Sequence, residues 1–146
     1  MSSGTINQLY DIIERIKVQL AYPDGASPYN NKISSDQIKS EYIDIDKANS
    51  YPMLCIVSTT IGLNQTDQIS SDQAVTVDVL GYVKDIDDPL ATALKLASDM
   101  ENSIMADDTL NGLVYSLSID YDVSAFTQGG FAAVMMSLKG IATRTE

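Results

Sequence analysis

Three carboxylates that could act together stand close in the sequence, at Asp85, Asp87 and Asp88 in the segment KDIDDP. Paired carboxylates can serve as general acid and base, and several convergent oxygens can bind calcium or magnesium. The segment lacks the spacing and the central glycine of an EF-hand loop. A helix start explains the same residues more simply, because Asp88 suits the N-cap and Pro89 the first helical position, while the nearby acids complement the helix dipole. We therefore predict a helix cap here, with a carboxylate-dependent hydrolase as the weakest alternative.

The other common catalytic groups are missing from the sequence. It has no histidine, and Cys55 is its one cysteine, so an intramolecular disulfide and a paired-cysteine metal site are both excluded. Cys55 lies within the apolar run from Tyr51 to Val57, without the neighbouring base that would lower the pKa of a nucleophilic thiol, so we expect a small buried hydrophobic residue. No GxSxG, GxGxxG or phosphate-binding loop is present. We expect no enzymatic activity, no cofactor and no metal.

Charge narrows the possible partners. The 146 residues carry 20 acidic and 9 basic side chains and a net charge of −11; residues 1–50 contribute −2 and residues 51–146 contribute −9. A field of this sign repels phosphates, and no Lys/Arg cluster offsets it, which argues against tight binding to nucleic acid or to an anionic membrane. No apolar run reaches the ~18 residues of a membrane span, and the N-terminus lacks signal-peptide features. We expect a soluble, cytosolic product.

Apolar periodicity predicts a helix near the N-terminus that ends near Tyr22, before Pro23 and Gly25. Its apolar residues recur three or four apart: Ile6, Leu9, Ile13, Ile16 and Leu20. Three further residues, Tyr10, Ile12 and Val18, widen the apolar arc. The helix is therefore either well buried in the core or partly covered by a second partner.

The polar segment 23–40 is rich in turn-forming residues and predicts a long loop or arm that leaves the core. It is either an arm onto a neighbouring subunit or a surface loop. Alternating apolar and acidic residues predict a half-exposed strand over 41–46, and a buried strand follows from Pro52. The polar stretch 61–73 predicts a hairpin loop or tip.

The second half predicts strand, helix, strand and strand in that order. A strand holds Val75, Val77 and Val79, and the helix that Asp88 starts carries Leu90, Leu94, Ala97 and Ile104 along its length. Period-2 alternation continues from Leu113 to Tyr121, and the last strand begins at Phe131. Met135 and Met136 must face opposite sides of that strand. Six residues are candidate assembly contacts: Tyr29, Gln65, Asp67, Phe126, Gln128 and Met136.

This order of segments resembles the tail terminator, or tail completion, proteins of tailed bacteriophages. The most telling pieces are Tyr51 and Pro52 with the apolar strand after them, the Asp88 and Pro89 helix start, and the turn over 110–114 into an alternating strand. Together these pieces cover nearly the whole chain, although each is a pattern and none an invariant signature. The long segment 23–40 departs from the plain family pattern.

The resemblance implies one α+β domain over residues 1–146, with a mixed or antiparallel sheet of about four to five strands packed by two main helices. It also implies a homo-oligomeric ring of about six subunits. Such a ring caps the tail tube protein, ends tail polymerisation and joins a neck or head-tail connector protein at the head-proximal end of the virion. The protein would be made in the host cytoplasm, DNA would only pass through the channel, and a sheath protein is an open further partner. The rival class is a small acidic binding module, such as a DNA-mimicking inhibitor.

Overall fold

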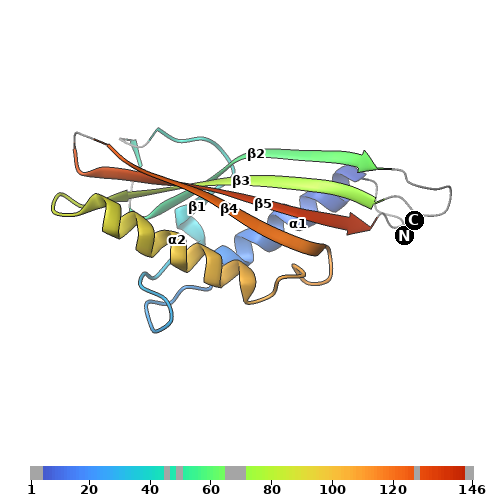
Figure 1. The fold of residues 1–146 in the computed structure, drawn as a ribbon, viewed down its shortest axis with the longest axis horizontal. Helices are drawn as coiled ribbons and strands as arrows, with labels where there is room; N and C mark the ends of the chain where they lie inside the picture. Colours follow the sequence, from blue (N-terminus) through green and yellow to red (C-terminus); the bar gives the residue numbers. More distant parts are fainter. Residues whose placement is uncertain (1–4, 45–46, 49–50, 65–71, 127–128, 144–146) are drawn as a thin grey trace.

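The structure is a computed structural model, and it describes residues 5–44, 47–48, 51–64, 72–126 and 129–143. Two helices and a five-stranded mixed sheet form one α+β fold, which confirms the predicted class (Figure 1). The elements in chain order are α1 (Thr5–Leu20), the 3-10 turn η1 (Ser35–Gln37), β1 (Ile38–Lys39), β2 (Met53–Asn64), β3 (Asp72–Lys84), α2 (Pro89–Met105), β4 (Tyr115–Ala125) and β5 (Phe131–Thr143).

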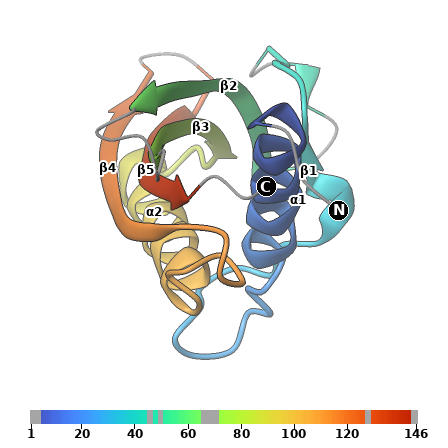
Figure 2. The ribbon, with the colours of Figure 1, turned by 90° about the vertical axis from the view of Figure 1, so that its right-hand side faces the viewer.

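The strands lie in the order β1-β2-β3-β5-β4. β1 is parallel to β2, and each remaining neighbouring pair is antiparallel. The sheet curves over both helices (Figure 2). Because side chains alternate along a strand, Val75, Val77 and Val79 of β3 enter the main core, whereas Thr76 and Asp78 face the opposite, outer side. The period-2 pattern of the sequence therefore identified the buried face of this strand correctly.

The buried stripe of α2 contains two of the four residues named from its apolar spacing, Ala97 and Ile104. Leu90 and Leu94 are 45% and 53% exposed, and the residues in the core are Ala93, Leu96, Ala97, Met100 and Ile104. Two apolar stripes run along this helix at helical spacing, and the stripe with the alanines is the one that lies against the sheet. Close approach is possible because β3 has Gly81 at the crossing, where an added Cβ would lie 2.9 Å from Leu96 Cδ2.

Two strand boundaries also differ from prediction. Residues 41–44 of the expected strand 41–46 form no strand. The strand that pairs with β2 on this side is β1, which lies just before these residues in the sequence. Ile43 instead packs on a second apolar cluster that covers the outer face of the sheet around Met53, Cys55 and Tyr82. An extended segment that lies flat on a sheet has one buried side and one exposed side. Its apolar and polar residues therefore alternate as they do in a strand, although it forms no strand pairing. The expected loop 61–73 is shorter, because β2 continues to Asn64 and β3 begins at Asp72.

The segment 23–40 is held against the core at several points, while its residues 24–28 are exposed as in a surface loop. Ile33 and Ile38 are 2% and 6% exposed, and both belong to the main core. The fully buried carboxylate of Asp99 on α2 accepts hydrogen bonds from Asn30 N and Asn31 N at 2.8 and 2.9 Å, and from both asparagine side chains. Four donors satisfy a charge that would be costly to bury alone.

Candidate assembly surfaces

The aspartates before α2 form a turn and a helix cap, as predicted. Asp88 Oδ1 accepts from Ala91 N at 3.1 Å, and Pro89 occupies the first helical position. Asp85 Oδ1 accepts from the backbone N–H groups of Asp87 and Asp88, and its Oδ2 accepts from Thr92 Oγ1 at 2.6 Å. The Thr92 hydroxyl and these two amides hold the pKa of Asp85 below its usual value. Within the described ranges, no three histidine, cysteine or acidic side chains are grouped so that they could hold a metal ion.

Cys55 has the buried, apolar role expected from its sequence neighbours. Its side chain is fully buried in the outer cluster with Met53, Tyr82 and Ala133. Burial raises the pKa of the thiol, so the nucleophilic thiolate is disfavoured at neutral pH. Neither described helix has the length and apolar character that crossing a bilayer would require.

The six predicted contact residues fall into three groups. Phe126 is 47% exposed at the end of β4, and Tyr29 is half-buried in the loop beside Asp99, where desolvation raises the pKa of its hydroxyl. Met136 is fully buried in the main core, because β5 turns this residue toward the helices, so it is not available as a surface contact. Three candidates lie outside the described residues: Gln65, Asp67 and Gln128.

An exposed apolar surface missed by the sequence reasoning lies at the start of α2. We define the α2 patch as Ile86, Leu90 and Leu94, which are 83%, 45% and 53% exposed. Phe126 belongs to the same end of the molecule, because Asp85 N donates to Gly130 O at 2.8 Å in the turn between β4 and β5. Large apolar side chains grouped on a surface mark an interaction site more strongly than isolated ones. The sequence pattern that could have indicated this surface is the second apolar stripe of the helix, which contains Leu90 and Leu94.

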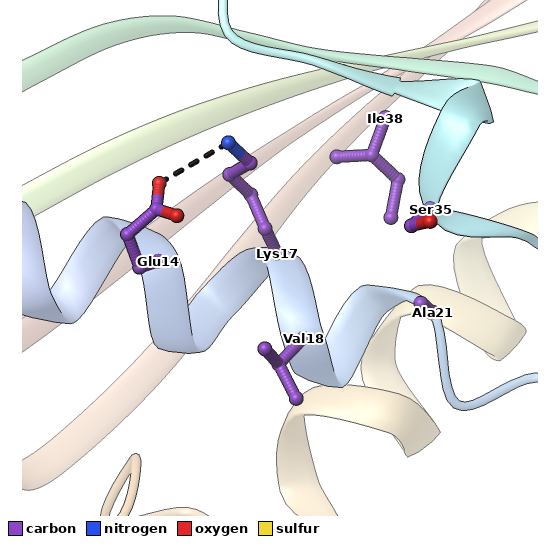
Figure 3. Close-up of a pocket in the computed structure, with 6 residues that line it drawn as sticks. All are labelled: Glu14, Lys17, Val18, Ala21, Ser35 and Ile38. Carbon is purple, nitrogen blue, oxygen red and sulfur yellow. Dashed lines mark hydrogen bonds and ion pairs between the residues drawn. The ribbon is translucent and has the colours of Figure 1, made fainter.

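A hollow of about 360 Å³ lies on the other side of the molecule, between α1 and the η1–β1 segment (Figure 3). Six residues line this α1 groove: Glu14, Lys17, Val18, Ala21, Ser35 and Ile38. The lining is mainly apolar, and Val18 is 51% exposed. Lys17 Nζ lies 3.1 Å from Glu14 Oε2, so the charges at its rim are paired with each other. The wide apolar arc predicted for the first helix therefore forms, in part, an accessible surface.

A buried polar contact fixes the two helices relative to each other. Gln19 on α1 is fully buried, and its Nε2 donates to the carbonyl oxygens of Ile104 and Asp107 at 2.9 and 3.1 Å, at the C-terminus of α2. Arg15 donates to Gln19 Oε1 at 2.8 Å and forms an ion pair with Asp107. These groups satisfy carbonyls that a helix end leaves without partners. These contacts join the helix that lines the α1 groove to the helix that carries the α2 patch.

The fold is shared with a known virion component. No protein-family model and no curated protein matches the chain. Among solved structures, it is similar to a chain of the virion of the native gene transfer agent (GTA) particle, with a TM-score of 0.51 and 7% sequence identity. The match covers 75% of this chain and 80% of that chain. At this identity the likeness is one of fold.

Proposed function

We propose that this chain is a structural protein of a phage-like virion. The observation that carries the proposal is the fold shared with a chain of the GTA virion over three quarters of this chain. The surface agrees with a role in assembly. The acidic cluster is used for a turn and a helix cap, and the exposed features include an apolar patch and an apolar groove.

The more specific proposal is a tail terminator. Copies of this chain form a ring of about six subunits that caps the tail tube, ends its polymerisation and offers a joining surface to the neck. A closed ring is built from head-to-tail contacts, so each subunit must present two different surfaces to its neighbours. The excess of acidic side chains suits a channel for DNA, because a negative lining repels phosphates and lets the duplex slide.

Mass photometry and negative-stain microscopy of the purified chain test the proposal. We expect a closed ring that binds the ends of purified tail tubes, and we expect unusually long tubes when the gene is deleted from its phage. A strict monomer that ignores tube ends would contradict the proposal. Capture of a DNA-processing enzyme in place of tail proteins would support the acidic binding module instead.

A further inference from the structure

The sheet has a long strand near each of its two edges, and each of these strands has a stretch of backbone that no described strand pairs with on its outer side. β4 is the last strand in the order, and its regular pairing with β5 runs from Ser118 to Ala125. β2 is flanked by β1 only at Leu54 and Cys55, and beyond the irregularity at Val57 no described strand lies along that side. An edge strand presents a row of N–H and C=O groups that another strand can pair with.

We propose that the sheet continues from one copy of this chain to the next, with β4 of one subunit paired to the 58–64 part of β2 in its neighbour. This inference rests on the proposed ring and names the contact that builds it. It is a head-to-tail contact, because the two edges are different strands.

Strand directions support this pairing. β2 is antiparallel to β3, β3 to β5, and β5 to β4, so β4 and β2 run in opposite directions within one subunit. Rotation about an axis roughly along the strands keeps these directions, so β4 meets the neighbouring β2 antiparallel, the more stable arrangement. Seven residues of β2 can form about seven backbone hydrogen bonds, within the ~10 ± 5 of a typical protein interface.

Charge disfavours the pairing of β4 with a second β4. The strand carries two exposed acids, Asp120 and Asp122. Asp120 forms a surface ion pair with Lys139 of β5 at 3.5 Å, and its side chain is 71% exposed, so water screens this pair strongly. If two β4 strands paired around a two-fold axis near Tyr121, the acids of one would oppose those of the other, and like charges directly opposite are destabilising. The β2 edge offers exposed, uncharged hydroxyl residues at Ser58, Thr59 and Thr60. This edge therefore places no like charge opposite the two carboxylates of β4.

Cross-linking between variants that each carry one added cysteine tests the contact. Ser118→Cys and Ser124→Cys label the β4 edge, Ser58→Cys and Thr60→Cys label the β2 edge, and all four positions are exposed. The native thiol of Cys55 is fully buried and contributes little background. One variant of each mixture carries a mass tag, a short bismaleimide bridges the thiols, and circular dichroism checks that each variant is folded.

We expect a cross-linked product from mixtures of a β4 variant with a β2 variant, and none from either variant alone. Ser98→Cys, on the exposed side of α2, is the matched control and should remain uncross-linked. Suppose that the unlabelled protein forms rings but cross-linked products appear only between two copies of the same variant, or only through Ser98→Cys. That result would overturn the edge pairing and leave the proposed ring intact. A monomeric parent protein would overturn both.

Discussion

Asp99, in the middle of α2, binds the loop that contains Asn30 and Asn31, which is far away in the sequence. Its buried carboxylate accepts four hydrogen bonds from Asn30 and Asn31. The Asp99→Asn change puts an amide NH2 against some of these donors, so we expect the free energy of unfolding to fall by about 2–3 kcal/mol. Urea titration measures the loss, and Asp108→Asn at an exposed site should stay within about 0.5 kcal/mol of the parent. Equal stability of the two variants would show that the loop is not held by Asp99.

Two strand glycines give a matched test of packing. A Cβ added at Gly81 would lie 2.9 Å from Leu96 Cδ2 and 3.1 Å from Leu54 Cδ2, whereas at Gly140 the nearest atom is 3.4 Å away. Gly81→Ala should therefore lower the free energy of unfolding by about 1–3 kcal/mol, because the closely packed side chains of Leu96 and Leu54 must shift to make room for the added Cβ. Gly140→Ala should be neutral or stabilising by up to about 1 kcal/mol. Thermal or urea unfolding compares them, and the opposite ranking would contradict the close contact of α2 with β3.

At the scale of elements, the turn before α2 makes stability depend on acid pH. The pKa of Asp85 is lowered, chiefly by the Thr92 hydroxyl, so its ionised form stabilises the folded state above the unfolded pKa of about 3.9. This contribution is lost as pH falls through the lower folded pKa, because the unfolded chain binds the proton more readily.

The expected result is that Asp85→Asn destabilises the protein near neutral pH and that the difference from the parent shrinks below about pH 4. Thr92→Val should show part of the same effect, since it removes the hydroxyl donor and keeps the carboxylate. Asp87→Asn, an exposed neighbour, is the control and should follow the parent at every pH. Urea titrations at several pH values decide this, and a pH-independent difference for Asp85→Asn would contradict it.

Local patterns in the sequence predicted the helices and strands better than they predicted the contacts between them. The N-cap of Asp88 and the alternation of Val75, Val77 and Val79 depend on neighbours in sequence, and both are confirmed. Which apolar stripe of α2 is buried depends on Gly81 in another element, so helical spacing could not decide it. Gln19 bonds to carbonyls more than 80 residues away, and no local pattern marks such a contact.

Considered as a whole molecule, the chain carries a net charge that opposes self-association. Its net charge is −11, and most of that charge belongs to residues 51–146, which include β4 and α2. Subunits in a ring therefore repel one another through their shared sign. Apolar burial and backbone pairing at the sheet edges must exceed this repulsion, and contacts between unlike surfaces keep the most acidic parts of two subunits apart.

Salt should strengthen assembly for this reason. Raising the ionic strength shortens the Debye length from about 30 Å at 0.01 M to about 3 Å at 1 M, which screens the repulsion between subunits. We expect sedimentation equilibrium to show tighter association at the higher salt concentration. The double variant Asp120→Asn/Asp122→Asn should associate more tightly at low salt and depend less on salt, because two carboxylates at the β4 edge are removed. Asp120 should contribute the smaller part, since Lys139 Nζ lies 3.5 Å from its carboxylate. Asp87→Asn/Asp108→Asn changes the net charge equally at exposed sites away from that edge and should have the smaller effect. Association that weakens with salt would instead indicate a contact between opposite charges, which the neutral hydroxyl edge of β2 does not provide.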